Sequence, residues 1–318
     1  MSEEQKQPKP TDAVLGGTTP PFRGAVLGGI QGLKKKLESS DQAVRVEALQ
    51  KAINYGEEGL KVLREATVED KKAVARNPKT PVEILQSLAQ HEDWWVCYEV
   101  AKNPNTPVEA LQSLAQHEGS IIRLHIARNR NTSVEALQSL AQDKYQDVRY
   151  EVAKNRNTPV EILHSLAQDE SSGVRSRVAR NPNTPVEILH SLAQDESSGV
   201  RSRVARNPNT PVEILHSLAQ HEDWLVRLGV AGNRNTPVEI LQSLAQDEHE
   251  WVRCEVARNP NTPVEILHSL AQHEDCLVRL GVAGNPNTPV EILHSLAQDK
   301  HWYVHKTADR ALRERRLK

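Results

Sequence analysis

The sequence predicts an all-α solenoid, and three observations carry this prediction. An asparagine recurs every 26 residues over most of the chain. Each 26-residue unit holds two segments whose apolar side chains follow a helical spacing, and the unit has too few of them to form a core alone. Such units become stable by stacking on their neighbours. We therefore expect one elongated array, although 318 residues would otherwise suggest two globular domains.

The repeating part of the chain runs from residue 77 to residue 310 and holds nine units. Two neighbouring units, 157–182 and 183–208, are identical in sequence. The asparagines that mark the nine units are Asn77, Asn103, Asn129, Asn155, Asn181, Asn207, Asn233, Asn259 and Asn285.

Each unit contains signals for the start of one helix and the end of another. Thr106 is the predicted N-cap of the first helix, Pro107 its first residue, and Glu109 is placed to accept from the Thr106 amide. In the opening unit, Ile84, Leu85, Leu88 and Ala89 then form one apolar stripe. A second, shorter helical segment, such as 174–179, ends at an Asn-Pro pair. We expect this asparagine to take the left-handed cap conformation.

These residues resemble a known family. The pattern VRxxVARNPNTPxEILxxLAxD is similar to the leucine-rich repeat variant (LRV), and the resemblance covers residues 77–310. It implies a right-handed, HEAT-like α-solenoid in which α-helices alternate with short 3-10 helices. Some members hold an iron–sulfur centre on an N-terminal cysteine cluster. No cysteine precedes Cys97 in this chain, so we expect no such cofactor.

The two ends of the chain depart from the repeat. Residues 1–24 are rich in Pro, Gly and Thr, and we expect a disordered tail there. Residues 25–76 look similar to HEAT-type helices and form the predicted N-terminal cap. The last residues, 311–318, form the predicted basic end of a helical C-terminal cap.

Composition excludes several classes of protein. The chain has 40 Lys and Arg against 42 Asp and Glu, a net charge of −2, which argues against a strongly basic nucleic-acid binder. Its three scattered cysteines match neither a disulfide framework nor a zinc site. No signal peptide or membrane-spanning run occurs, so we expect a cytoplasmic protein. We also expect no enzyme activity, because no constellation of catalytic residues is present.

The units differ from one another mainly before and along the second helix. Aromatic and Leu side chains gather at these variable positions, which point away from the apolar stripe. Exposed rings on a rigid scaffold are typical of protein-binding hot spots, so we expect a protein or peptide partner here. The alternative is that some rings, Trp94 above all, pack between units. The candidate partner-binding residues are Trp94, Trp95, Tyr98, Tyr145, Tyr150, Trp224, Leu228, Trp251, Leu280, Trp302 and Tyr303.

Two polar columns leave further alternatives. An arginine column from Arg123 to Arg279 either tracks nucleic-acid phosphates or pairs across units with aspartates such as Asp169, Asp195 and Asp247; we favour the pairing. Lys102, Arg128, Arg180, Arg206, Arg313, Arg315 and Arg316 would assist nucleic-acid binding. A histidine column (His164, His190, His216, His268 and His294) is interpreted as a solvated face, with metal binding as the alternative. A weaker possibility is an accessory factor that acts on another protein.

Overall fold

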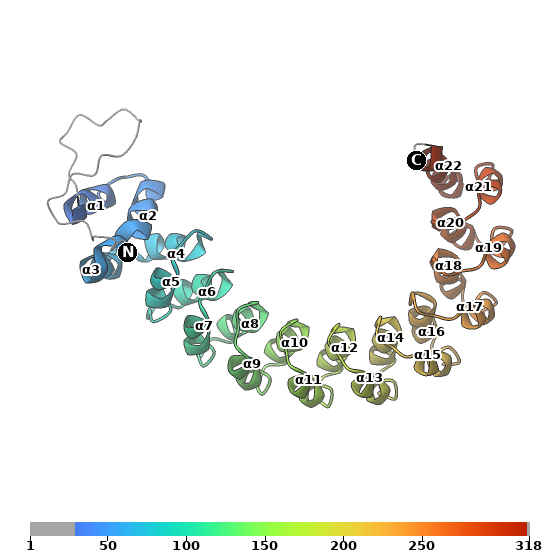
Figure 1. Cartoon of the computed structure of the whole chain (residues 1–318), viewed down its shortest axis with the longest axis horizontal. Helices are drawn as coiled ribbons and strands as arrows, with labels where there is room; N and C mark the ends of the chain where they lie inside the picture. The colour runs from blue at the N-terminus through green and yellow to red at the C-terminus, as the bar shows by residue number, and fades with distance from the viewer. Residues whose placement is uncertain (1–28, 317–318) are drawn as a thin grey trace, which may run out of the picture. The chain divides into compact units, whose positions relative to one another are not determined.

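The computed structural model describes residues 29–316, which form helices joined by short loops, with no strand in that range (Figure 1). The all-α solenoid prediction is confirmed. The tail predicted over residues 1–24 lies outside the described residues. No helix within the described range is long and apolar enough to cross a membrane.

The chain divides into two compact units, residues 1–157 and 158–318, and each is described by itself. The first unit begins with α1 (Gly29–Leu37), α2 (Gln42–Lys51), the 3-10 helix η1 (Ala52–Tyr55), α3 (Gly56–Glu65) and α4 (Val68–Arg76). It continues with α5 (Val82–Leu88), α6 (Trp94–Lys102), α7 (Val108–Leu114), α8 (Ser120–Arg128), α9 (Val134–Leu140) and α10 (Gln146–Lys154).

The second unit contains the remaining helices. They are α11 (Val160–Leu166), α12 (Ser172–Arg180), α13 (Val186–Leu192), α14 (Ser198–Arg206), α15 (Val212–Leu218), α16 (Trp224–Ala231), α17 (Val238–Leu244), α18 (Glu250–Arg258), α19 (Val264–Leu270), α20 (Cys276–Gly284), α21 (Val290–Leu296) and α22 (Trp302–Arg316). In both units the even-numbered helices from α4 onward stack on one another, and the odd-numbered helices form a second row beside them (Figure 1).

Both helices of each repeat are α-helices, so the expected alternation with 3-10 helices is wrong for residues 82–316. The second helix is also not the shorter one: α5 has seven residues and α6 has nine. The helix α6 begins at Trp94, two residues before the buried Val96. Asp93 caps it and accepts hydrogen bonds from the amides of Trp95, at 2.9 Å, and Val96, at 3.3 Å.

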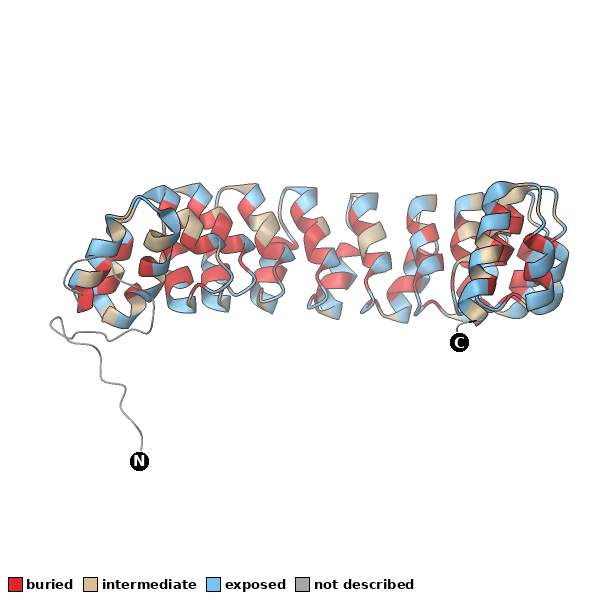
Figure 2. Cartoon of the chain, turned by 90° about the horizontal axis from the view of Figure 1, so that it is seen from above, coloured by how far each residue is buried: buried red, intermediate tan, exposed pale blue. Residues whose placement is uncertain are grey.

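The predicted apolar stripe forms the core. Ile84 and Leu85 are fully buried, and Val96 and Val100 of the second helix face them with no exposed surface. Figure 2 shows the buried residues on the sides where helices meet and the exposed residues on the outer turns. The core therefore runs along each stack of repeats and is not confined to one centre.

Threonine does not cap the helix that follows it, contrary to the prediction. Pro107 occupies the N-cap position of α7, which has no side-chain cap, and the Thr106 amide donates to the carbonyl oxygen of Asn103 at 3.2 Å. The Thr106 hydroxyl is fully buried and donates to the carbonyl oxygen of Val100, at 2.5 Å. Threonine thus bonds to an end carbonyl of the preceding helix, which also accepts from the Asn103 amide at 3.0 Å.

The asparagine at each helix end is extended and not left-handed as expected. Asn103 has φ −66° and ψ 126°, and no residue other than glycine has a positive φ within 29–316. Its side chain reaches back to the preceding repeat, where Nδ2 donates to the carbonyl oxygens of Ala75, at 2.6 Å, and Asn77, at 2.9 Å. Its Oδ1 accepts from the Asn105 amide at 2.9 Å. The asparagine therefore joins two repeats as well as closing a turn.

Candidate partner-binding surface

The candidate aromatic residues lie mainly at the N-terminal turns of the even-numbered helices. Six of them are between 42% and 56% exposed, namely Trp94, Trp95, Tyr145, Trp251, Trp302 and Tyr303. The other five, Tyr98, Tyr150, Trp224, Leu228 and Leu280, are half-buried. The alternative that Trp94 packs between repeats is wrong, since 42% of its surface is exposed.

In the first unit, α6 carries a compact ring cluster. The rings of Trp94 and Trp95 stack at 4.0 Å between centroids, and Tyr98 meets Trp95 edge-on at 5.7 Å. The Lys72 ammonium lies 5.6 Å from the Trp95 ring centroid, and the edge of Tyr98 contacts His125 of α8 at 4.9 Å. These contacts hold exposed apolar area in a defined arrangement, which lowers the entropy lost when a partner binds.

A second aromatic position of this unit lies before α10. Tyr145 is exposed, and two cations lie over its ring: the Arg123 guanidinium at 5.8 Å and the Lys144 ammonium at 5.2 Å from the ring centroid. Such cation–ring contacts orient the ring without burying it.

In the second unit, Trp224, Trp302 and Tyr303 stack on neighbouring rings. Trp224 stacks on His249 of the next repeat at 4.0 Å, which explains its partial burial, and Trp302 stacks on Tyr303 at 3.6 Å. Trp251 at the start of α18 is exposed. The interpretation that rings pack between repeats therefore holds in part for Trp224.

The arginine column pairs with aspartates of the following repeat, as favoured from the sequence. Arg175 donates from Nε and Nη2 to the two carboxylate oxygens of Asp195, at 2.6 and 2.9 Å. Arg123–Asp143, Arg227–Asp247 and Arg279–Asp299 have the same two-bond geometry. Burial alone would raise the pKa of Asp195, but hydrogen bonds from Arg175 and from the Ser197 amide hold it below the ordinary 3.8. The pairing with aspartate occupies these arginines, so they are not available to bind phosphates.

Histidine replaces aspartate in two of these pairs in the second unit. Like the aspartate, His221 and His273 accept from the amide two residues later, in each case at 2.9 Å through Nδ1. They offer no carboxylate to the arginine of the preceding repeat, and the Nε groups of Arg201 and Arg253 are buried without a hydrogen-bond partner. Histidine can therefore replace aspartate at this position, because it makes the same bond to the amide two residues later.

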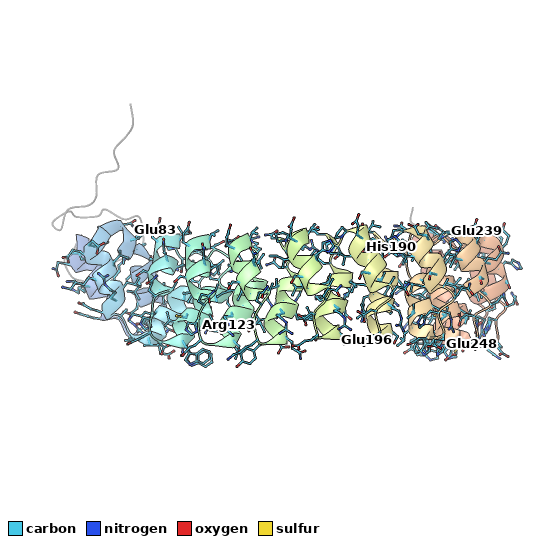
Figure 3. All side chains as sticks on the ribbon, turned by 90° about the horizontal axis from the view of Figure 1, so that it is seen from below. Glu83, Arg123, His190, Glu196, Glu239 and Glu248 are labelled. Atoms are coloured by element: carbon cyan, nitrogen blue, oxygen red, sulfur yellow. The ribbon has the colours of Figure 1, made fainter. Side chains whose placement is uncertain are left out.

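The other histidine column lies on the odd-numbered helices. Figure 3 shows His190 and Glu239 at one edge of the second unit and Glu196 and Glu248 at the opposite edge. His190 lies 3.7 Å from Glu213, and both side chains are more than half exposed. Among the residues that the structure describes, no group of three His, Cys, Asp or Glu side chains is placed to hold a metal ion.

Sequence reasoning missed an exposed valine column. The first residue of every odd-numbered helix from α5 to α21 is a valine that is between 39% and 49% exposed: Val82, Val108, Val134, Val160, Val186, Val212, Val238, Val264 and Val290. The signal was present in the sequence, because this valine directly follows Pro or Ser and lies two residues before the buried position. It gives the second row a regular apolar stripe, and this stripe varies less than the aromatic positions.

A family model described as leucine rich repeat variant matches residues 250–275, which contain α18 and α19. These residues therefore carry the leucine rich repeat variant pattern. This confirms the predicted resemblance for residues 250–275, and the same 26-residue pattern recurs in the other units of the chain. No curated protein matches the chain.

Several solved helical repeat structures are similar to the chain. A structure described as a leucine-rich repeat variant with a novel repetitive structural motif is 29% identical, covers 70% of this chain and 88% of its own, and has a TM-score of 0.48. Importin beta is 13% identical over 88% of this chain and 46% of its own, with a TM-score of 0.29. A computationally designed armadillo repeat protein for modular peptide recognition is 15% identical over 88% and 97%, with a TM-score of 0.16.

Proposed function

We propose that this chain is a non-catalytic scaffold that binds a protein or peptide through the exposed aromatic and half-buried Leu side chains of its even-numbered helices. Helical repeat solenoids are typical of interaction scaffolds. The observation that carries the proposal is the clustering of exposed rings on helices whose buried positions scarcely change. The Trp94–Trp95 stack at 4.0 Å is its strongest element, since both rings are more than 40% exposed.

The proposed mechanism is passive. The rings are held by their neighbours before a partner arrives, so binding orders few additional side chains. Tryptophan and tyrosine bury a large area and also offer a polar group, which is why they dominate binding energy at protein interfaces. Differences between repeats at these positions would set the choice of partner.

A displayed library of random short peptides, selected on the immobilised chain, tests this function. Enriched peptides are then measured against a Trp94→Ser/Trp95→Ser variant. Loss of two hot-spot rings should weaken binding about 30-fold or more. The matched control is Val108→Ser/Val134→Ser, which removes exposed apolar side chains from the other row. Equal binding by the wild type and the tryptophan variant would contradict the proposed surface, and no enrichment on the wild type would contradict the proposed function.

One observation favours nucleic-acid binding as a second candidate function. The adjacent helices α12 and α14 carry Arg177, Arg180, Arg203 and Arg206 and no acidic residue. A basic patch of this kind attracts a polyanion, and its affinity would fall steeply with salt concentration. Titration with a single-stranded oligonucleotide at low and high salt tests the candidate, and no binding at low salt would remove it.

A further inference from the structure

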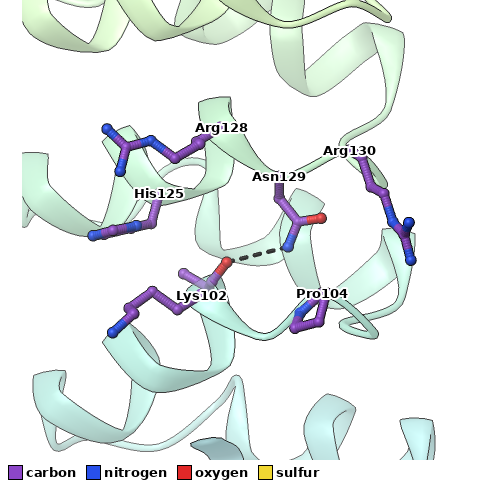
Figure 4. A pocket seen from close by; sticks show the side chains of 7 residues that line it. Lys102, Pro104, His125, Arg128, Asn129 and Arg130 are labelled. Carbon is purple, nitrogen blue, oxygen red and sulfur yellow. Dashed lines mark hydrogen bonds between the residues drawn. The ribbon is translucent and has the colours of Figure 1, made fainter. Parts of the chain in front are cut away.

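A pocket of about 260 Å³ lies between the C-terminal ends of α6 and α8. Its lining is Ala101, Lys102, Pro104, His125, Arg128, Asn129 and Arg130. Figure 4 shows the polar ends of Lys102, His125 and Arg128 on one side of Asn129, with Arg130 on the other side. The Asn129 amide is already engaged, because it donates to the Ala101 carbonyl oxygen at 3.2 Å. The pocket therefore presents basic groups and few acceptors.

The pocket forms where a repeated ion pair is interrupted. Helices α4, α6 and α8 each end in a basic residue, and the residue 23 positions later lies on the next even-numbered helix. Arg76 pairs in this way with Glu99 at 2.6 Å, and Arg128 pairs with Glu151 at 2.8 Å. Between these two pairs, Lys102 meets His125, so this step lacks the carboxylate that its neighbours have.

Lys102 has no carboxylate within ion-pair distance among the residues that the structure describes. Its ammonium lies 5.0 Å from the centroid of the Tyr98 ring. Burial, followed by the positive charges of Arg128 and Lys102, lowers the pKa of His125 below 6.5, so the imidazole is neutral near pH 7. A neutral imidazole still donates one hydrogen bond without adding to the repulsion between the two cations.

We propose that this pocket binds the carboxylate of an Asp or Glu side chain on a partner peptide, held by Lys102, His125 and the Nη1 group of Arg128, whose Nε and Nη2 already donate to Glu151. The proposal rests on the proposed function and names the chemistry of the partner. Tyr98 connects the pocket to the ring cluster. Its ring centroid lies 5.7 Å from that of Trp95 and 4.9 Å from that of His125. The partner segment would therefore place an apolar anchor on the rings and an acidic residue beside it.

A peptide fits this site better than a nucleic acid does. Two of the basic groups at and beside the pocket already have carboxylate partners: Arg76 pairs with Glu99, and Arg128 donates from Nε and Nη2 to Glu151. The Glu99 and Glu151 side chains are only 4% and 7% exposed. A polyanion needs a continuous basic track, and carboxylates placed at every second step interrupt one. A single carboxylate needs only one such binding site.

The substitution His125→Glu tests the pocket with a residue that the chain itself has at this position in neighbouring repeats. The substitution reproduces the glutamates found at this position in the repeats before and after, so the variant should fold and Lys102 should gain a partner inside the pocket. Peptide-display selections are run in parallel on the wild type and this variant. Lys102→Gln is a second variant, and Lys79→Gln is the control, because it removes one positive charge at an exposed site outside the pocket.

The wild type and the Lys79→Gln control should enrich peptides that combine an aromatic or apolar residue with Asp or Glu. The His125→Glu and Lys102→Gln variants should keep the apolar preference, lose the acidic one, and bind a wild-type-selected acidic peptide about tenfold or more weakly. Equal acidic enrichment on wild type and His125→Glu would overturn the pocket assignment alone. No enrichment on the wild type would overturn the proposed function as well. Binding of a single-stranded oligonucleotide that His125→Glu abolishes would overturn the peptide assignment.

Discussion

Asn129 donates from its side chain to the backbone carbonyl oxygen of Asn103, at 3.0 Å, and to that of Ala101, at 3.2 Å. The same two bonds occur one repeat earlier, where Asn103 donates to Asn77 and Ala75. Because each buried amide reaches back 26 and 28 residues, a unit of another length would break both bonds. The ladder of asparagines therefore fixes the repeat length as well as the contact between neighbouring repeats.

The first prediction concerns this ladder in the second unit. Asn207 donates to the carbonyl oxygens of Ala179, at 2.7 Å, and Asn181, at 3.2 Å, and accepts from the Asn209 amide at 2.8 Å. Asn207→Ala should lower the free energy of unfolding by about 2–4 kcal/mol, because buried backbone groups lose their partners. Urea denaturation followed by circular dichroism measures the loss.

Asn209→Ala is the matched control for Asn207→Ala. Asn209 is exposed and donates one side-chain hydrogen bond, to the carbonyl oxygen of Pro182 at 2.8 Å. Water can replace that bond, so this variant should lose less than about 1 kcal/mol. Equal losses in the two variants would mean that the buried ladder has no special role.

The repeat length, the two helices and the buried stripe could be predicted from the sequence, because periodicity directly reports which side chains face a neighbour. The roles of Thr106 and Asn103 could not. Both residues have strong local preferences, for N-caps and for left-handed caps, which describe one isolated helix end. In this fold Thr106 bonds instead to a carbonyl oxygen of the preceding helix, and Asn103 to carbonyl oxygens of the preceding repeat. Neither partner belongs to the helix end that the local preference describes.

The second prediction concerns the ion pairs between repeats. Arg227 donates to Asp247 at 2.6 and 3.0 Å, and both side chains are at most 10% exposed. Arg227→Gln should lower the free energy of unfolding by about 3–5 kcal/mol, because it leaves a buried carboxylate without its partner. Arg206→Gln is the control: Arg206 lies 3.7 Å from Glu255 and is 37% exposed, so its loss should cost under about 1 kcal/mol. Thermal denaturation distinguishes the two, and similar melting temperatures would refute the prediction.

The third prediction compares two glycines of α20. A Cβ at Gly281 would lie 2.7 Å from the Cys254 carbonyl oxygen and 2.9 Å from the Ala257 Cβ on α18, whereas a Cβ at Gly284 meets nothing within 4 Å. Gly281→Ala should therefore lower the free energy of unfolding by about 1–3 kcal/mol despite the better helix propensity of alanine. Gly284→Ala should be neutral or stabilising by up to about 1 kcal/mol. A stabilised Gly281→Ala variant would show that α18 and α20 separate without cost.

The candidate surface could be predicted in outline, and for a physical reason. Variable residues on a repeated scaffold mark the positions that the core does not constrain, and six of the eleven candidates are exposed. The pocket beside α6 could not be found in this way. The pocket depends on His125, which occupies the position where the two neighbouring repeats have glutamate. This difference matters only because Lys102 of the adjacent helix α6 lines the same pocket.

The last prediction concerns the histidines that replace aspartate between repeats. His273 accepts from the Asp275 amide, and Arg253 of α18, Glu274, Asp275 and Arg279 are the charged groups that act on it. Burial, and then the positive charge of Arg253, lowers the pKa of His273 below 6.5. As the pH falls below 6.5, the unfolded chain binds this proton before the folded chain does, so stability must decrease with falling pH.

His273→Asp should remove this loss and add an ion pair. The aspartate would occupy the place that Asp247 has one repeat earlier, where it accepts from an amide at 2.9 Å and binds an arginine, and it would give the buried Arg253 Nε a partner. We expect stabilisation by about 1–3 kcal/mol near neutral pH, with a larger difference from wild type at about pH 5.5. Urea denaturation across this pH range measures both effects, with the exposed His268→Asp as control. A constant difference between His273→Asp and wild type at every pH would mean that His273 does not resist protonation in the folded chain.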